Sequence, residues 1–174
     1  MDYRIQRHPG MILTGFGQRF TGTPYGPARE QQEEALYVTT RGKQWLLRGA
    51  SVGKPDEETD VRYYGVIRHV DEEGYDFHIC FHLHPWNRQH LLDTAVTGMP
   101  EIAAMGFEQI NIPEGLYAVF STESTASPMT PYHQLRLALS SQWLPEKGYQ
   151  LADRPEIQLI HTDHAEVWLP IEPI

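Results

Sequence analysis

The second half of the chain contains the stretch INIPEGLYAVFSTES (residues 110–124), PYHQLRLALSSQWLPEKGYQL (131–151) and RPEIQLIHTDHAEVWLPI (154–171). The first segment reads as a strand, and the last reads as two short strands around 157–161 and 165–169. Apolar residues of the middle segment recur at the spacing of one helical face: Tyr132, Leu135, Leu139 and Trp143. The stretch therefore predicts the order strand, helix, strand, strand.

The first half of the chain shows the same order of elements. A strand or hairpin is predicted within 3–21, a helix over 28–40, and two strands over 61–70 and 76–84. Two copies of a βαββ unit would give antiparallel sheets with two main helices, pseudo-two-fold symmetry and a central ligand cleft. We therefore predict an α+β fold that forms a single ligand-binding domain over residues 1–174. The domain would consist of a first unit (1–85), a linker (86–108) and a second unit (109–174).

The composition is that of a globular protein with a sizeable core. Of the 174 residues, 40% are apolar and 11% are aromatic, rings that suit both cores and ligand pockets. Asp and Glu number 23 against 14 Lys and Arg, and the net charge of −9 argues against direct nucleic-acid binding. With only Cys80, no internal disulfide can form, and no signal peptide or membrane-spanning stretch is recognisable. We therefore expect a cytoplasmic protein that does not bind membranes.

Several short motifs resemble one known family. They are DYRI (2–5) with GF (15–16), YGV (64–66), GLYAVF (115–120), QWLPEKGY (142–149), PEI (155–157) and LPI (169–171). The set resembles the gyrase-inhibitor-like (GyrI-like) domain, which is also the effector-binding half of some AraC/XylS-type transcription regulators. It is similar as well to the ligand domain of multidrug-sensing regulators. The resemblance covers nearly the whole chain, and the QWLPEKGY run is its most specific part.

The resemblance implies a duplicated βαββ fold with a pocket for lipophilic, often cationic, compounds. The chain begins where the family's ligand domain begins, with no room upstream for a helix-turn-helix, so the resemblance implies a stand-alone module. The expected function is non-enzymatic binding of amphipathic, cationic small molecules or drugs. The module would then resemble the effector-binding domain of a transcription regulator without its DNA-binding domain.

One position departs from the family pattern. Many members carry a pocket glutamate on the strand that corresponds to 155–160, and that position corresponds here to Gln158. A buried carboxylate selects strongly for a cation, whereas a neutral glutamine weakens this selection. Glu156 lies two residues earlier on the same strand face and could supply the carboxylate if it points inward, although its place near the strand start favours exposure. Gln158 also fits a hydrogen-bonded polar residue of a sheet.

The last strand supplies the aromatic part of the expected pocket. If its aliphatic residues face the helices, Trp168 faces the cleft beside Ile160 and Gln158 of the neighbouring strand. Such a wall would bind flat apolar rings and assist a cation through the ring face. Core packing is the competing interpretation of Trp168. Tyr64 and Tyr117 are further candidates for the wall or rim of the cleft.

A strand of alternating histidines raises the question of a metal. One face of 76–84 carries His78, Cys80, His82 and His84, and the other carries Phe77, Ile79, Phe81 and Leu83 as core. A His-x-His pair can supply two nitrogens to Zn²⁺, with His161 and His164 as further ligands if the two halves approach there. The simpler interpretation, a polar and partly exposed sheet face without a metal, is the one that we adopt.

The sequence contains no nucleophile or phosphate-binding motif such as G-x-S-x-G. We therefore expect neither catalysis nor a cofactor. The alternative is a hydrolase of electrophilic genotoxic compounds, a class that the family resemblance includes, but an amide at Gln158 is a poor general acid. A protein partner such as a topoisomerase, by family analogy, and a homodimer through exposed aromatic strands are further open interpretations.

Overall fold

The computed structural model describes residues 3–24, 26, 28–51, 61–93, 100–123, 134, 148–161 and 163–174. The helices are α1 (Ala28–Thr39), α2 (Arg41–Gly49), α3 (Pro85–Leu92) and α5 (Pro100–Ala103). The strands are β1 (Tyr3–His8), β2 (Met11–Thr21), β3 (Val61–Arg68), β4 (Gly74–Phe81), β5 (Glu108–Ile112), β6 (Gly115–Glu123), β7 (Tyr149–Leu151), β8 (Glu156–His161) and β9 (His164–Pro173). The predicted helical stripe lies outside these residues: Tyr132, Leu135, Leu139 and Trp143. None of the described helices is both long and apolar enough to cross a membrane.

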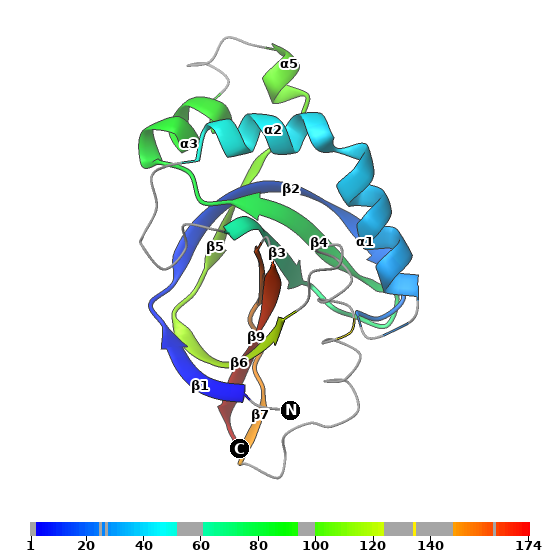
Figure 1. Cartoon of the computed structure of the whole chain (residues 1–174), viewed down its shortest axis with the longest axis vertical. Coiled ribbons are helices and arrows are strands. Elements are labelled where there is room, and N and C mark those ends of the chain that lie inside the picture. The colour runs from blue at the N-terminus through cyan, green and yellow to red at the C-terminus, as the bar shows by residue number, and fades with distance from the viewer. Residues whose placement is uncertain are drawn as a thin grey trace.

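The described strands form one antiparallel sheet in the order β1-β6-β9-β8-β3-β4-β2-β5, and β7 pairs with β9. The sheet curls into a half-barrel with α1 and α2 on one face (Figure 1). Strand β1 forms one edge, and the chain then crosses to β2, which pairs with β4 and β5 near the other edge. The α+β prediction is confirmed. The predicted helix of the second unit falls on residues outside the described ones, so the duplication of a βαββ unit stays a prediction.

The sheet is buried on both faces, which we call the helix face and the distal face. On the helix face, α1 and α2 pack on a core that includes Phe77 and Ile79 of β4. On the distal face, a second core contains Tyr117, Ile157 and Trp168 and no residue of α1 or α2. A strand residue therefore belongs to one core or the other according to its place in the period-two alternation.

Strand β4 shows this alternation, with one correction to the sequence analysis. The predicted core residues all belong to the helix-face core: Phe77, Ile79, Phe81 and Leu83. His78 and Cys80 point to the distal side and are 5% and 0% exposed, whereas His82 is half-buried and His84 is exposed, so the expectation of a partly exposed face is wrong for the first two residues only. The strand also ends before His84, whose ring accepts a hydrogen bond from the Trp86 N–H at the start of α3.

Candidate functional site

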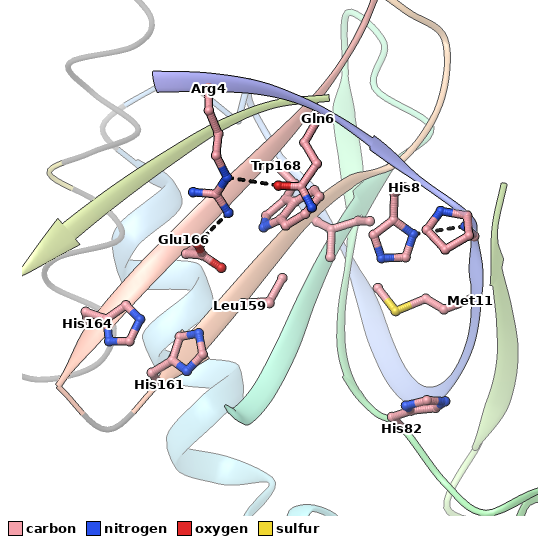
Figure 2. Close-up of a pocket in the computed structure, with 13 residues that line it drawn as sticks. Arg4, Gln6, His8, Met11, His82, Leu159, His161, His164, Glu166 and Trp168 are labelled. Atoms are coloured by element: carbon pink, nitrogen blue, oxygen red, sulfur yellow. Dashed lines mark hydrogen bonds and ion pairs between the residues drawn. The ribbon is translucent and has the colours of Figure 1, made fainter. Parts of the chain in front are cut away.

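A pocket of about 570 Å³ opens on the distal face of the sheet. Its walls come from β1, the β1–β2 turn, β8 and β9, together with His82 just beyond β4 (Figure 2). Only β6 separates β1 from β9 in the sheet, and side chains of β1 reach those of β9. The pocket therefore combines the first strand of the chain with the last two.

The floor of the pocket is apolar and aromatic. Trp168 of β9 pairs with Ile157 of β8, and Leu159 lies on the same face two residues further along β8. Trp168 is 6% exposed, and its ring packs edge-on against Tyr117 and His8, with centroid distances of 5.9 and 5.4 Å. Within the described part of the chain, the indole Nε1 has no hydrogen-bond partner. The floor therefore offers an aromatic and apolar surface to a bound molecule.

A charged pair lies beside this floor. The Arg4 Nη2 donates to Glu166 Oε2 at 3.1 Å, and the Arg4 guanidinium carbon lies 5.8 Å from the centre of the Trp168 ring. The Ser121 hydroxyl is 3.5 Å from the same carboxylate oxygen. The side chain of Glu166 is 15% exposed and that of Arg4 is 51% exposed. A partly buried carboxylate next to an indole face is an arrangement that binds cations.

Histidines line the side of the pocket opposite Arg4 (Figure 2). The rings of His161 and His164 stack at a centroid distance of 4.0 Å, and His164 Nδ1 lies 2.7 Å from Asp163 Oδ1. That hydrogen bond lowers the pKa of the Asp163 carboxyl. Among the residues with described positions, no group of three or more His, Cys, Asp or Glu could hold a metal ion. The histidines form a polar wall of the pocket.

The structure places the predicted aromatic residues together. Trp168 lines the pocket, and Tyr64 and Tyr117 belong to the same distal-face core without lining the pocket themselves. Both tyrosines are almost completely buried. Their proposed contact with a ligand stays a prediction.

The other predicted residues lie on the opposite face of the sheet. Glu156, Gln158 and Ile160 point to the helix face, because Trp168 pairs with Ile157 and not with an even-numbered residue of β8. The expected grouping of Gln158 and Ile160 beside Trp168 is therefore wrong in register. Any role of these three residues in ligand binding stays a prediction.

The polar residues of β8 are buried beneath the helices. Glu156 was expected to be exposed, but it is 6% exposed, because β8 lies between β3 and β9 inside the sheet. The pKa of Tyr75 is raised chiefly by burial, and the nearby carboxylates of Glu33 and Glu156 contribute. Gln158 is also buried, and its Oε1 lies only 2.2 Å from the point where a Cβ on Gly65 would be. Glycine at this position therefore leaves room for the amide.

Sequence reasoning missed the contribution of the first strand. Arg4, Gln6 and His8 alternate along β1 and all line the pocket. Their alternation was the one available signal that they share a face. The pairing of β1 with β6, and through β6 with β9, joins the two ends of the chain and has no local sequence signature.

His78 provides a pH-dependent prediction. Burial lowers the pKa of His78, and its hydrogen bond to Glu108 offsets part of that effect. As the pH falls below about 6.5, the unfolded chain takes up a proton before the folded chain does, so stability decreases until the folded pKa is reached. We expect wild type to lose more unfolding free energy than His78→Gln between about pH 7.5 and about pH 5.5. Urea denaturation of both proteins measures this, and identical losses would contradict the assignment.

Comparisons with known proteins agree with this architecture. No curated protein matches the chain in sequence. The structure of SAV2435 bound to tetraphenylphosphonium is 12% identical, with 99% of this chain and 94% of that chain covered and a TM-score of 0.65. An integron cassette protein from the mobile metagenome of Vibrio cholerae, VCH_CASS2, is 13% identical, with 98% and 95% coverage and a TM-score of 0.64.

The C-terminal domain of EcmrR shares the fold more distantly. It is 14% identical, with 99% of this chain and 98% of that domain covered and a TM-score of 0.52. The family model described as "GyrI-like small molecule binding domain" matches residues 55–172 of this chain. The match includes β8 and β9, which form the floor of the pocket. The chain therefore belongs to the family of GyrI-like small-molecule-binding domains.

Proposed function

We propose that this protein binds amphipathic, cationic small molecules in the distal-face pocket and does not transform them chemically. The observation that carries the proposal is the position of the Glu166 carboxylate beside the face of Trp168 within a cavity of about 570 Å³. The ring face attracts a cation, the carboxylate provides the opposite charge, and Ile157 and Leu159 provide apolar area for the rest of the molecule.

The size and depth of the pocket suit such a ligand. Pockets for drug-sized molecules have volumes of about 300–1,000 Å³ and combine apolar walls with a few polar groups. Here the apolar part is the floor formed by β8 and β9, and the polar part is the rim formed by Arg4, Glu166 and the histidines. Tetraphenylphosphonium, the molecule bound to the similarly folded SAV2435, is therefore a reasonable first probe.

A titration with a charged and a neutral ligand tests this proposal. Isothermal calorimetry should give a micromolar dissociation constant for tetraphenylphosphonium and at least about fivefold weaker binding for triphenylphosphine oxide, because an ion pair in a partly buried site adds about 1 kcal/mol or more. Glu166→Gln keeps the shape of the side chain and should bring the two affinities closer together. Arg7→Ala is the matched control, because Arg7 pairs with Glu114 on the surface, away from the pocket lining.

The outcome also decides between binding and catalysis. Hydrolysis by acid catalysis needs a group that donates a proton to the ligand, and the proposal gives Glu166 the role of a hydrogen-bond acceptor and counter-charge instead. The ligand should therefore be recovered unchanged after prolonged incubation with the protein. If the neutral compound binds as tightly as the cation, or if Glu166→Gln leaves the preference unchanged, Glu166 is not the group that recognises charge.

A further inference from the structure

The cation-binding position beside Trp168 is already filled by a side chain of the protein. The Arg4 guanidinium lies over the Trp168 ring, donates to Glu166 at 3.1 Å through Nη2 and donates to Gln6 Oε1 at 2.9 Å through Nε (Figure 2). It thus has an aromatic face, a carboxylate and an amide oxygen as partners. These are the contacts that a planar cation with N–H donors would make in the same place.

Arg4 is held loosely compared with a structural arginine of the same sheet. Its side chain is 51% exposed and extends from β1, which among the described strands pairs with β6 alone. Arg154, by contrast, is partly buried and donates through Nη2 to the backbone carbonyls of Leu116 and Ile171. The guanidinium end of the pair is half exposed, so water replaces part of its contacts when Arg4 leaves its position.

We propose that Arg4 is an internal competitor that occupies the ligand's cation position, and that the preferred ligands are guanidinium or amidinium compounds with an apolar group. This inference rests on the proposed function and specifies the ligand class and the regulation of the same pocket. A guanidinium ligand can take over the hydrogen bonds to Glu166 and Gln6 when it displaces Arg4. A quaternary ammonium ion has no N–H group and loses both bonds while it still gains the ring contact.

The test compares phenethylguanidinium with phenethyltrimethylammonium by calorimetry on wild type, Arg4→Ala and Arg7→Ala. Arg4→Ala should tighten binding of phenethylguanidinium about fivefold, because the ligand no longer has to displace Arg4 from Glu166 and from the Trp168 ring. Phenethyltrimethylammonium should gain by the same factor when it displaces Arg4, and it should bind both proteins more weakly than phenethylguanidinium, because it cannot donate to Glu166 or Gln6. Arg7→Ala lies on the same strand but outside the pocket lining, and it should change neither affinity.

The possible outcomes separate this inference from the proposed function. Suppose that tetraphenylphosphonium binds wild type, but that Arg4→Ala binds phenethylguanidinium no more tightly than wild type does. Arg4 would then be a residue that contacts the ligand, and its role as an internal competitor would be disproved. If the two phenethyl cations bind Arg4→Ala with equal affinity, the guanidinium preference is disproved. If no cation binds either wild type or Arg4→Ala, the proposed function itself fails. Thermal unfolding monitored by circular dichroism shows whether each variant is folded before its binding is interpreted.

Discussion

Replacing Glu33 by alanine is expected to lower the free energy of unfolding by about 3 kcal/mol, because the change removes one member of a buried ion pair. Glu33 and Arg29 lie one turn apart on α1, with side chains 0% and 3% exposed, and Arg29 Nε donates to Glu33 Oε1 at 2.5 Å. Arg29 also donates through Nη1 to the Pro24 carbonyl. Without Glu33, the buried guanidinium loses its carboxylate, and desolvation of the charge is no longer offset by this pair.

Urea denaturation measures this loss, and two other variants show its cause. Glu34→Ala removes a carboxylate from the exposed side of the same helix and should change stability by less than about 0.5 kcal/mol. The double variant Arg29→Met with Glu33→Leu removes both charges and should be more stable than Glu33→Ala alone, because no isolated charge is buried. If the double variant is the less stable of the two, packing rather than charge accounts for the effect.

The sequence contained enough information to predict most of the strands and which side of β4 forms the core. It did not separate β5 from β6, because 110–124 was predicted as one strand, and it did not predict β7. Phe77, Ile79 and Phe81 were assigned to the core from their alternation alone, and they belong to the helix-face core. The family was recognisable from short motifs, and its model matches residues 55–172. These features are local, because alternation and turn residues depend on neighbours in the chain.

The composition of the pocket depends on strand pairing, which is not local. The alternation on β8 separates Ile157 and Leu159 from Gln158, but only the register with β9 shows which set joins Trp168. A shift of one residue exchanges the two faces of a strand. Glu156 illustrates a related difficulty: its exposure was judged from its place at the strand start, whereas the neighbouring strands β3 and β9 determine its burial. Arg4 reaches the pocket only because β1 joins the far edge of the sheet.

Trp168→Leu is expected to weaken tetraphenylphosphonium binding by about tenfold or more, because it removes the ring face on which a partly desolvated cation lies. Leucine retains an apolar side chain, so triphenylphosphine oxide should lose less affinity than the cation. Trp86→Leu is the matched control, since Trp86 is 61% exposed on α3 and does not line this pocket. Calorimetry on the three proteins measures both affinities after unfolding curves have shown that each variant is folded.

A conservative change at the same position identifies the pocket by a different signal. Trp168→Phe retains a weaker aromatic face and should bind the cation with an affinity between those of wild type and Trp168→Leu. The fluorescence test is made in a Trp143→Phe background, because Trp143 lies outside the described residues. Ligand-induced quenching should then largely disappear in Trp168→Phe while calorimetric binding persists, because Trp45 and Trp86 are exposed on α2 and α3 and lie outside the pocket lining. Full quenching in Trp168→Phe would place the ligand elsewhere. The buried pair Glu156 and Gln158 on the helix face would then be the next positions to substitute, because they are the remaining polar residues of the predicted site.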